Sequence, residues 1–316
     1  MTRRLHHRVI DLFRQLGESY VLILLLAIFV GLFVPQAIVI SPHITAILVV
    51  IFFLNSLRID FDEVTSHFRN KRLLLLSSLW MLVVRPMLVF WLIRPLSAEM
   101  AVGLMVLFAM PAAMSSPIIA EMVGGKHDLS LVLTVTSSLL GMLTIPLVIR
   151  VAAGQAVAVD VVAMFWSLVK VVILPFLVAQ IVRRFWPKPA EVAAEKTKPL
   201  IIFVLGLMII GVIASKALDI LGGLRGPFFT TLLVIFGLFI VCHVVGYGLA
   251  FWRPRRERVT VAVSATYVNF TLAIFLTSKF FPDPRIFMPV ILAVLPWSLL
   301  MGPFQHAVKR WHLAGH

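Results

Sequence analysis

The stretch AMPAAMSSP, residues 109–117, interrupts an otherwise apolar run with two prolines and two serines. It is flanked by AVGLMVLF (101–108) and IIAEMV (118–123), so the interruption falls inside a segment long enough to cross a bilayer. Pro111 and Pro117 each remove a backbone donor and crowd the preceding helical turn. Carbonyl groups freed at membrane depth are tolerated only when protein buries them or a wet cavity solvates them. The stretch therefore predicts a broken membrane helix beside a binding site.

The rest of the chain has the composition of a membrane protein. Of its 316 residues, 61% are hydrophobic and 13% are charged, and the mean hydropathy is +1.04. Soluble domains carry about 25% charged residues, so the excess apolar surface needs lipid as its solvent. The net charge of +14 is concentrated in short loops between apolar runs. Loops on the cytoplasmic side of a membrane have this character, and we therefore exclude a nucleic-acid-binding function.

Apolar runs of about 20 residues predict ten transmembrane helices. The predicted spans are 19–35, 38–57, 73–93, 99–123, 128–150, 161–182, 199–216, 227–251, 259–280 and 286–308. Alternate loops differ in basic residues, with twenty on one side and six on the other. The six are Arg94, Arg150, Lys216, Arg225, Lys279 and Arg285. Both termini are therefore predicted to be cytoplasmic, in a cell (inner) membrane.

Five spans per half make the sixth helix enter from the side opposite to the first, which gives two halves of inverted topology. Such repeats are common in secondary transporters, whose substrate sites lie near the midplane between discontinuous helices. The span-nine stretch that corresponds to 109–117 is SATYVNFT (264–271), which is polar but has no proline or glycine. The alternative interpretation is a pair of kinked packing helices whose hydroxyl groups make interhelical contacts.

The chain resembles the bile acid:sodium symporter family, which has the fold of the apical sodium-dependent bile acid transporter. The resemblance covers nearly the whole chain and rests on LNSLRIDF (54–61), the 110–136 stretch with SLVLT (130–134), SLVKVVILP (167–175) and SATYVNFTLA (264–273). It implies an all-α integral membrane fold of ten helices in two inverted five-helix repeats, with a panel domain and a core domain. In the core, spans 4 and 9 are broken and cross each other. The implied ranges are a basic cytoplasmic segment 1–18, panel helices 19–72 and 158–222, and core helices 73–157 and 223–316.

The resemblance also implies where sodium ligands of the family fall in this chain. Four positions still offer a side-chain oxygen: Ser116, Ser130, Thr134 and Ser264. However, Pro117 stands in place of an asparagine and Ser264 in place of a shared glutamate. Two family glutamines fall on Met81 and Val268. The ion sites are therefore expected to be weak or vestigial, with no cofactor, no metal site and at most one weakly bound Na⁺.

Titratable groups inside the apolar runs are the other candidates for a functional site. A charge at the bilayer centre costs about 2.5–3.5 kcal/mol on insertion scales, so Arg85 should face a cavity or a partner. The alternative is that Arg85 snorkels toward the outer headgroups. Its guanidinium suits a carboxylate, or can supply the positive charge that a bound ion gives in the symporters. The predicted substrate-binding residues are Arg85, Asn269, Thr266, Ser115 and His243, and the predicted helix breaks are Pro111 and Pro117.

The sequence thus predicts a secondary transporter that moves a small organic anion, either a carboxylate or a bile-acid-like amphipathic acid, by alternating access with weak or absent sodium dependence. The alternatives are a sodium-coupled symporter with one remaining sodium site, a non-transporting receptor or scaffold, and an intramembrane enzyme. An enzyme is not expected, because the chain has neither a nucleophile with a base nor an H-E-x-x-H motif. An arsenite-type carrier is also disfavoured, because its functional cysteine would fall near Met110 or Pro111. The expected partners are the substrate and the lipid bilayer, and the oligomeric state is left open.

Overall fold

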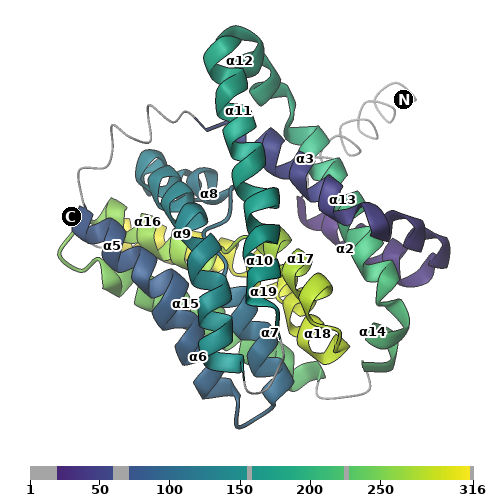
Figure 1. Ribbon diagram of the computed structural model, residues 1–316. Coiled ribbons are helices and arrows are strands. Elements are labelled where there is room, and N and C mark those ends of the chain that lie inside the picture. Colours follow the sequence, from purple (N-terminus) through teal and green to yellow (C-terminus); the bar gives the residue numbers. More distant parts are fainter. Residues whose placement is uncertain (1–19, 60–70, 155–158, 224–227, 314–316) are drawn as a thin grey trace, which may run out of the picture. The chain divides into compact units, whose positions relative to one another are not determined.

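The fold of the chain is almost entirely helical. The computed structural model describes residues 20–59, 71–154, 159–223 and 228–313 (Figure 1). The basic segment predicted for residues 1–18 lies outside the described residues. The chain divides into two compact units, of which the first comprises Met1–Arg58 and Leu174–Gly222 and the second comprises Ile59–Ile173 and Gly223–His316. The assignment of panel and core ranges stays a prediction.

Several helices have the length and apolarity needed to cross a membrane. In the described part of the chain there are six: Pro35–Ser56, Lys71–Ile93, His127–Ala153, Val161–Phe185, Phe228–Leu249 and Pro284–Arg310. The bent pair Pro187–Ala194 and Pro199–Ser215 raises the number to seven. Two shorter apolar helices, Ala98–Ala109 and Phe270–Phe280, fall in the predicted spans 4 and 9. An all-α integral membrane protein is therefore supported, and the ten-helix count stays a prediction.

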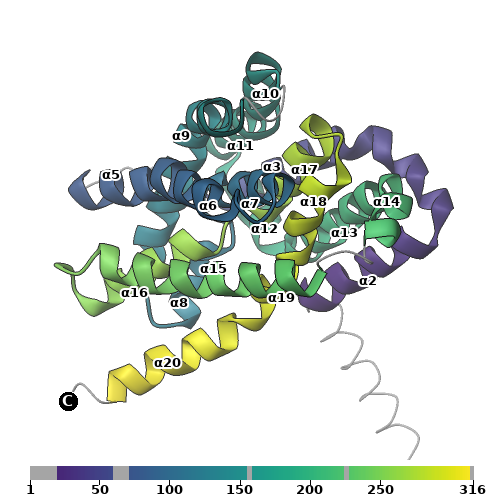
Figure 2. The same cartoon turned by 90° about the horizontal axis from the view of Figure 1, so that it is seen from below.

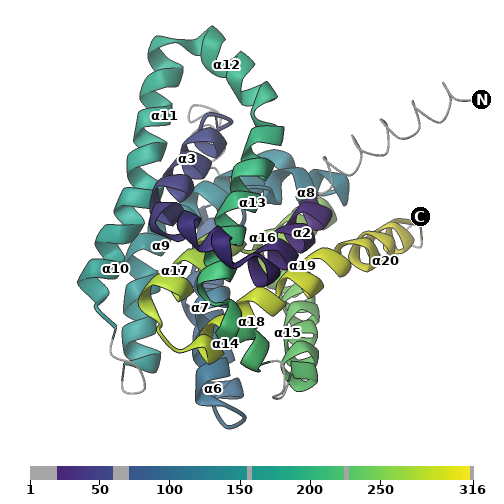
Figure 3. The ribbon, with the colours of Figure 1, turned by 90° about the vertical axis from the view of Figure 1, so that its right-hand side faces the viewer.

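The first unit is built around one long helix. Its elements are α2 (Tyr20–Phe33), η1 (Pro35–His43), α3 (Ile44–Ser56), α11 (Leu174–Phe185), α12 (Pro187–Lys196), α13 (Lys198–Ser215) and α14 (Ala217–Gly223). Helix α13 packs against α2, η1 and α3, and α11 packs against α3 (Figure 3). Arg183 of α11 donates to the Leu57 carbonyl at 2.8 Å. The bond supplies a partner to a carbonyl that the end of α3 leaves open.

The second unit holds the two interrupted helices. Its elements are α5 (Lys71–Leu79), η2 (Trp80–Val84), α6 (Arg85–Ile93), α7 (Ala98–Ala109), α8 (Ser116–Met122), α9 (His127–Ala153), α10 (Val161–Leu168), η3 (Val169–Ile173), α15 (Phe228–Leu249), α16 (Arg255–Thr266), α17 (Phe270–Phe280), α18 (Pro284–Leu292), α19 (Val294–Leu299) and α20 (Met301–Leu313). Helix α15 runs beside α16 (Figure 2), and α7 packs against α6 and α18.

Helices α7 and α16 form the centre of this unit. Every residue of α7 from Met100 to Ala109 is buried, and so is every residue of α16 from Val259 to Thr266. A helix that is covered on all sides belongs to the interior of a bundle rather than to its lipid-facing surface. Both helices end inside the unit, so their last carbonyl groups need partners from the protein.

Candidate functional site

The two interrupted helices meet where each of them breaks. An isolated antiparallel β-bridge pairs Ala112 with Val268. Around it, the Ala113 amide donates to the Tyr267 carbonyl and the Asn269 amide donates to the Pro111 carbonyl, both at 2.8 Å. Extended backbone of this kind is tolerated at membrane depth only when protein buries it or a wet cavity solvates it, and these bonds supply partners from the protein. We refer to residues 110–115 and 267–269 as the crossing.

The span-nine break forms although its sequence contains neither proline nor glycine. Tyr267 and Asn269 leave the helical conformation with ψ values of 87° and 83°. The Asn269 side chain then caps α17, because its carboxamide oxygen accepts from the Leu272 amide at 3.1 Å. In span four, Pro111 lies between α7 and α8. Pro117 lies in the first turn of α8, where a backbone N–H would make no bond within the helix, so its absence breaks none.

The four predicted ion-binding residues lie together beside the crossing and are all buried. The Ser130 and Ser264 hydroxyls are 3.0 Å apart. Ser116 donates to the Tyr267 carbonyl at 3.2 Å, and Thr134 reaches the Ala113 carbonyl at 3.5 Å. These oxygens therefore hydrogen-bond one another and the backbone of the crossing. Their role as ion ligands stays a prediction.

Arg85 lies at the same place and is only 2% exposed. Its guanidinium donates to four backbone carbonyls and to no side chain that the structure describes around it: Nε to Phe108 at 2.9 Å, Nη1 to Ala265, and Nη2 to Met81 at 3.0 Å and to Met110 at 3.2 Å. Nη2 also donates to Phe108. The snorkelling alternative is wrong, because the guanidinium is held in the interior. Substrate binding by Arg85 stays a prediction.

The backbone before Arg85 explains why one of its partners is its own helix. The segment η2 is a π-helix, in which the Arg85 amide donates to Trp80 five residues back rather than to Met81 four residues back. In that register the next donor to the Met81 carbonyl would be residue 86, which is a proline and has no N–H. The Arg85 Nη2 group supplies the missing bond. Single π turns in helices frequently mark functional sites.

The remaining predicted substrate-binding residues have different surroundings. The Thr266 hydroxyl is buried and has no hydrogen-bond partner among the described residues. Ser115 precedes α8 and makes no side-chain cap bond there. His243 of α15 lies 2.8 Å from the Phe239 carbonyl through Nδ1 and 3.3 Å from the Tyr267 hydroxyl through Nε2. Tyr267 was not predicted from the sequence, yet it joins His243 to the crossing through one side chain. A tyrosine in a polar interruption was the only signal for it.

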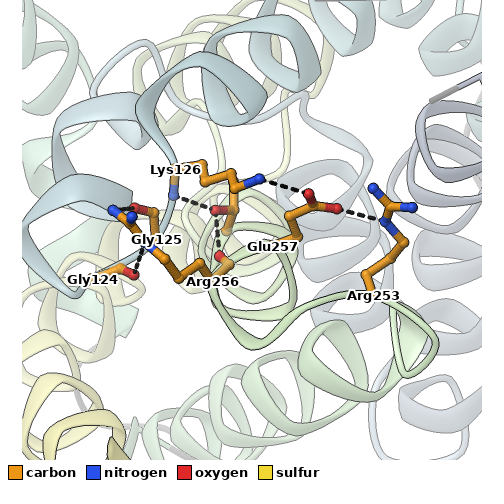
Figure 4. Close-up of polar contacts among 7 residues, drawn as sticks. Gly124, Gly125, Lys126, Arg253, Arg256 and Glu257 are labelled. Carbon is orange, nitrogen blue, oxygen red and sulfur yellow. Dashed lines mark hydrogen bonds and ion pairs between the residues drawn. The ribbon is translucent and has the colours of Figure 1, made fainter. Parts of the chain in front are cut away.

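A second unpredicted group is Glu257, at the beginning of α16 and just before the predicted ninth span. Its carboxylate lies between Lys126 and Arg253, with Nζ at 2.8 Å and Nε at 2.6 Å (Figure 4). Burial alone raises the pKa of the Glu257 carboxyl, but the hydrogen bonds and positive charges of Arg253 and Lys126 outweigh it, and the pKa is lowered. We call these three residues the Glu257 cluster. The cluster attaches the turn before α9 to the start of α16.

A second ion pair that joins the two halves has a corresponding position. Glu99, in the first turn of α7, accepts from Arg285 at 2.8 Å, and Arg285 lies in the first turn of α18. In both cases a glutamate at the start of the first half-helix of one broken span pairs with a base at the start of the next helix after the other broken span, α9 for Lys126 and α18 for Arg285. The Glu99–Arg285 pair is much more exposed, with the arginine side chain 70% accessible. Among the described residues, no group of three or more metal-ligating side chains could hold a metal ion.

Comparison with known proteins identifies the family. The model of the Sodium Bile acid symporter family matches residues 45–223, which is more than half of the chain. The chain belongs to the sodium bile acid symporter family. The resemblance inferred from the sequence is thus confirmed, and the matched range includes the span-four break, Ser130, Thr134 and Arg85.

Similar curated proteins carry the names of transporters rather than of enzymes. A rice protein named "Probable sodium/metabolite cotransporter BASS2, chloroplastic" (Oryza sativa subsp. japonica) is 24% identical over 77% of this chain and 58% of its own length. "Uncharacterized sodium-dependent transporter YocS" of Bacillus subtilis is 27% identical over 67% of this chain and 64% of its own length. "Sodium/bile acid cotransporter 7" of Danio rerio is 30% identical over 46% of each chain. The chain spans less than two thirds of the length of these relatives.

Proposed function

We propose that the chain is a secondary transporter that moves a small organic anion across the membrane by alternating access. The observation that carries the proposal is the crossing, where two broken helices meet inside one compact unit and expose backbone groups to each other. Secondary transporters place their substrates at such breaks near the bilayer midplane. An anion is proposed because, among the described residues, the charged side chain that contacts the crossing itself is the guanidinium of Arg85.

The proposal includes ten spans in two inverted halves. It also places the protein in the inner (cell) membrane with both termini in the cytoplasm. Two features support the inverted arrangement. Helices α7 and α16 each have 12 residues, and each is followed by a gap and a second half-helix. The Glu99–Arg285 pair and the Glu257–Lys126 pair join the two halves in a reciprocal way. The cytoplasmic termini rest on the twenty-to-six division of basic residues between the loops.

We further propose that sodium has a weak effect on transport. A cluster of oxygens, often including a carboxylate, suits a monovalent cation, and the residues at and beside the crossing offer hydroxyls and carbonyls. The Ser264 and Ser130 hydroxyls share a hydrogen bond at 3.0 Å, and the Ser116 hydroxyl donates a hydrogen bond to the Tyr267 carbonyl. A cation would have to replace these bonds. The second candidate is a sodium-coupled symporter, which is favoured by the sodium in the names of the relatives and by the four hydroxyl oxygens that remain together.

The transport proposal is tested by a thermal-shift screen of organic acids on the purified protein, followed by flux of the best binder into proteoliposomes. A ligand that binds the folded state raises the free energy of unfolding by RT ln(1 + [L]/Kd), which is about 2.7 kcal/mol at a hundred times Kd. We expect at least one small carboxylate or amphipathic acid to raise the melting temperature and to be taken up. Binding without uptake in intact, oriented vesicles would indicate a receptor instead.

A further inference from the structure

The end of α7 leaves carbonyl groups that need donors from elsewhere in the protein. The last four carbonyls of any α-helix have no donor within the helix. In α7 the Leu107 carbonyl receives the Met110 amide at 3.2 Å. The Phe108 carbonyl and the carbonyl of the capping residue Met110 accept hydrogen bonds from the Arg85 guanidinium. Because this helix end is fully buried, these groups need partners from the protein, and Arg85 supplies them.

The end of α16 uses the same guanidinium. There the Val263 carbonyl accepts a hydrogen bond from the Tyr267 amide at 2.9 Å, and the Thr266 carbonyl accepts one from the Val268 amide at 3.1 Å. The Ala265 carbonyl receives Nη1 of Arg85. One side chain from a third helix therefore bonds the C-terminal ends of both broken helices. The two ends lie in different halves of the chain, 157 residues apart between Phe108 and Ala265.

The charges at this point offset each other. The C-terminal end of a helix carries about half a negative elementary charge, so two converging ends bring about one negative charge into the interior. In a region with few charged groups this charge attracts a cation strongly. Arg85 supplies one fixed positive charge, and its planar fork reaches carbonyls in several directions at once. A lysine ammonium, which is a compact point charge, would not reproduce this arrangement.

We propose that Arg85 is a resident cation that binds the C-terminal ends of α7 and α16 and keeps the crossing assembled without an inorganic ion. The inference rests on the proposed transport function, because it explains how a relative of sodium-dependent carriers can hold its broken helices with weak sodium dependence. Arg85 is in this sense a positioning residue, since it contacts the backbone of the crossing. It acts on a substrate through the shape of the crossing.

The proposal is tested by cation rescue in detergent solution, without any substrate. Arg85→Ala removes Cγ, Cδ and the guanidinium group, and leaves a space the size of an ethylguanidinium ion beside the four carbonyls. We expect it to lower the melting temperature by on the order of 10 °C, because two buried helix ends lose their counter-charge. Ethylguanidinium at millimolar concentration should restore a large part of the loss. Ethylurea, which has a similar shape and no charge, should restore little. Arg94→Ala, which removes an exposed arginine from the end of the same helix, is the matched control and should respond to neither compound.

Sodium provides a second readout of the same site. Sodium chloride, compared with choline chloride, should raise the melting temperature of Arg85→Ala and leave that of the wild type unchanged. If the alanine variant does not fold, Arg85→Lys and Arg85→Met replace it. The lysine variant should be the more stable of the two, because it keeps the charge.

Three results would overturn the proposal: an unchanged melting temperature for Arg85→Ala, equal rescue by ethylurea and ethylguanidinium, or an Arg85→Met variant as stable as Arg85→Lys. All of these are measured on the purified chain without transport. Failure of the resident-cation inference is therefore distinguishable from failure of the proposed function, which would show as absent anion flux in the wild type.

Discussion

The Glu257 cluster gives the most quantitative stability prediction, because one buried carboxylate is held by two bases that water can reach. The Glu257 side chain is 7% exposed, whereas Lys126 is 44% and Arg253 is 26% exposed. Removing both bases, by Lys126→Ala with Arg253→Ala, leaves the carboxylate buried and unpaired. Breaking a buried pair in this way costs about 3–5 kcal/mol. Each single substitution keeps one charged hydrogen bond and should cost about 1.5–3 kcal/mol.

Adding Glu257→Gln to the double variant provides the decisive comparison. The amide carries no charge, so its burial beside two alanines should cost less than burial of the carboxylate, and the triple variant should be more stable than the double variant. The free energy of unfolding is measured by SDS titration in mixed micelles, and the set of variants forms a thermodynamic cycle. Arg285→Ala is the matched control, because it breaks exposed pairs with Glu99 and Asp283 and should cost at most about 1 kcal/mol.

Two results would refute this reasoning. The first is a triple variant that is less stable than the double variant, which would mean that the buried carboxylate needs no counter-charge. The second is a loss for Arg285→Ala as large as that for the double variant, which would mean that exposure does not distinguish the two ion pairs.

Further predictions concern pH, packing and topology. The folded-state pKa of Glu257 lies below its ordinary value, so its ionised form stabilises the fold. This contribution is complete above about pH 4.3 and is lost as the pH falls through the folded-state pKa. Glu257→Gln should therefore flatten the acid limb of a melting-temperature profile. In thermal unfolding, Gly103→Ala should lower the free energy of unfolding by about 1–3 kcal/mol, because an added Cβ meets the Ile286 carbonyl. The Cβ of Gly237→Ala meets nothing within 4 Å, so this control should be neutral or stabilising by up to about 1 kcal/mol. A cysteine in place of Lys188 should react with an impermeant maleimide only from the cytoplasmic side; labelling from outside would contradict the proposed topology.

The sequence predicted the membrane class and one of the two helix breaks for clear physical reasons. Runs of apolar residues have few solutions other than membrane helices, and Pro111 disrupts a helix wherever it stands outside the first turn. Pro117 is different, since it lies in the first turn of α8. The span-nine break had no local signal of this kind. It forms because Tyr267 and Asn269 pair with span four, and such pairing between distant segments is not visible in the local sequence.

The contacts of the two important charged residues were also beyond the sequence. Intramembrane placement identified Arg85 as a functional candidate, but its partners are carbonyl groups, which every residue carries. Only the folded arrangement shows which carbonyls are left open. Glu257 lies just before the predicted span 259–280, and this position gives no sign of burial. Its burial depends on Lys126, which lies 131 residues earlier in the chain.

The proposed anion transport with weak sodium dependence is tested most directly by uptake of the best-binding organic acid into proteoliposomes. Uptake is measured at fixed membrane potential with sodium, and then with sodium replaced by potassium or choline. We predict that the initial rate changes by less than about threefold, because the buried Arg85 already neutralises the helix ends and the hydroxyls beside the crossing bond one another. A fall of about tenfold or more, which corresponds to at least about 1.4 kcal/mol of lost stabilisation, together with a dependence on sodium concentration steeper than first order, would contradict the proposal and indicate sodium-coupled symport.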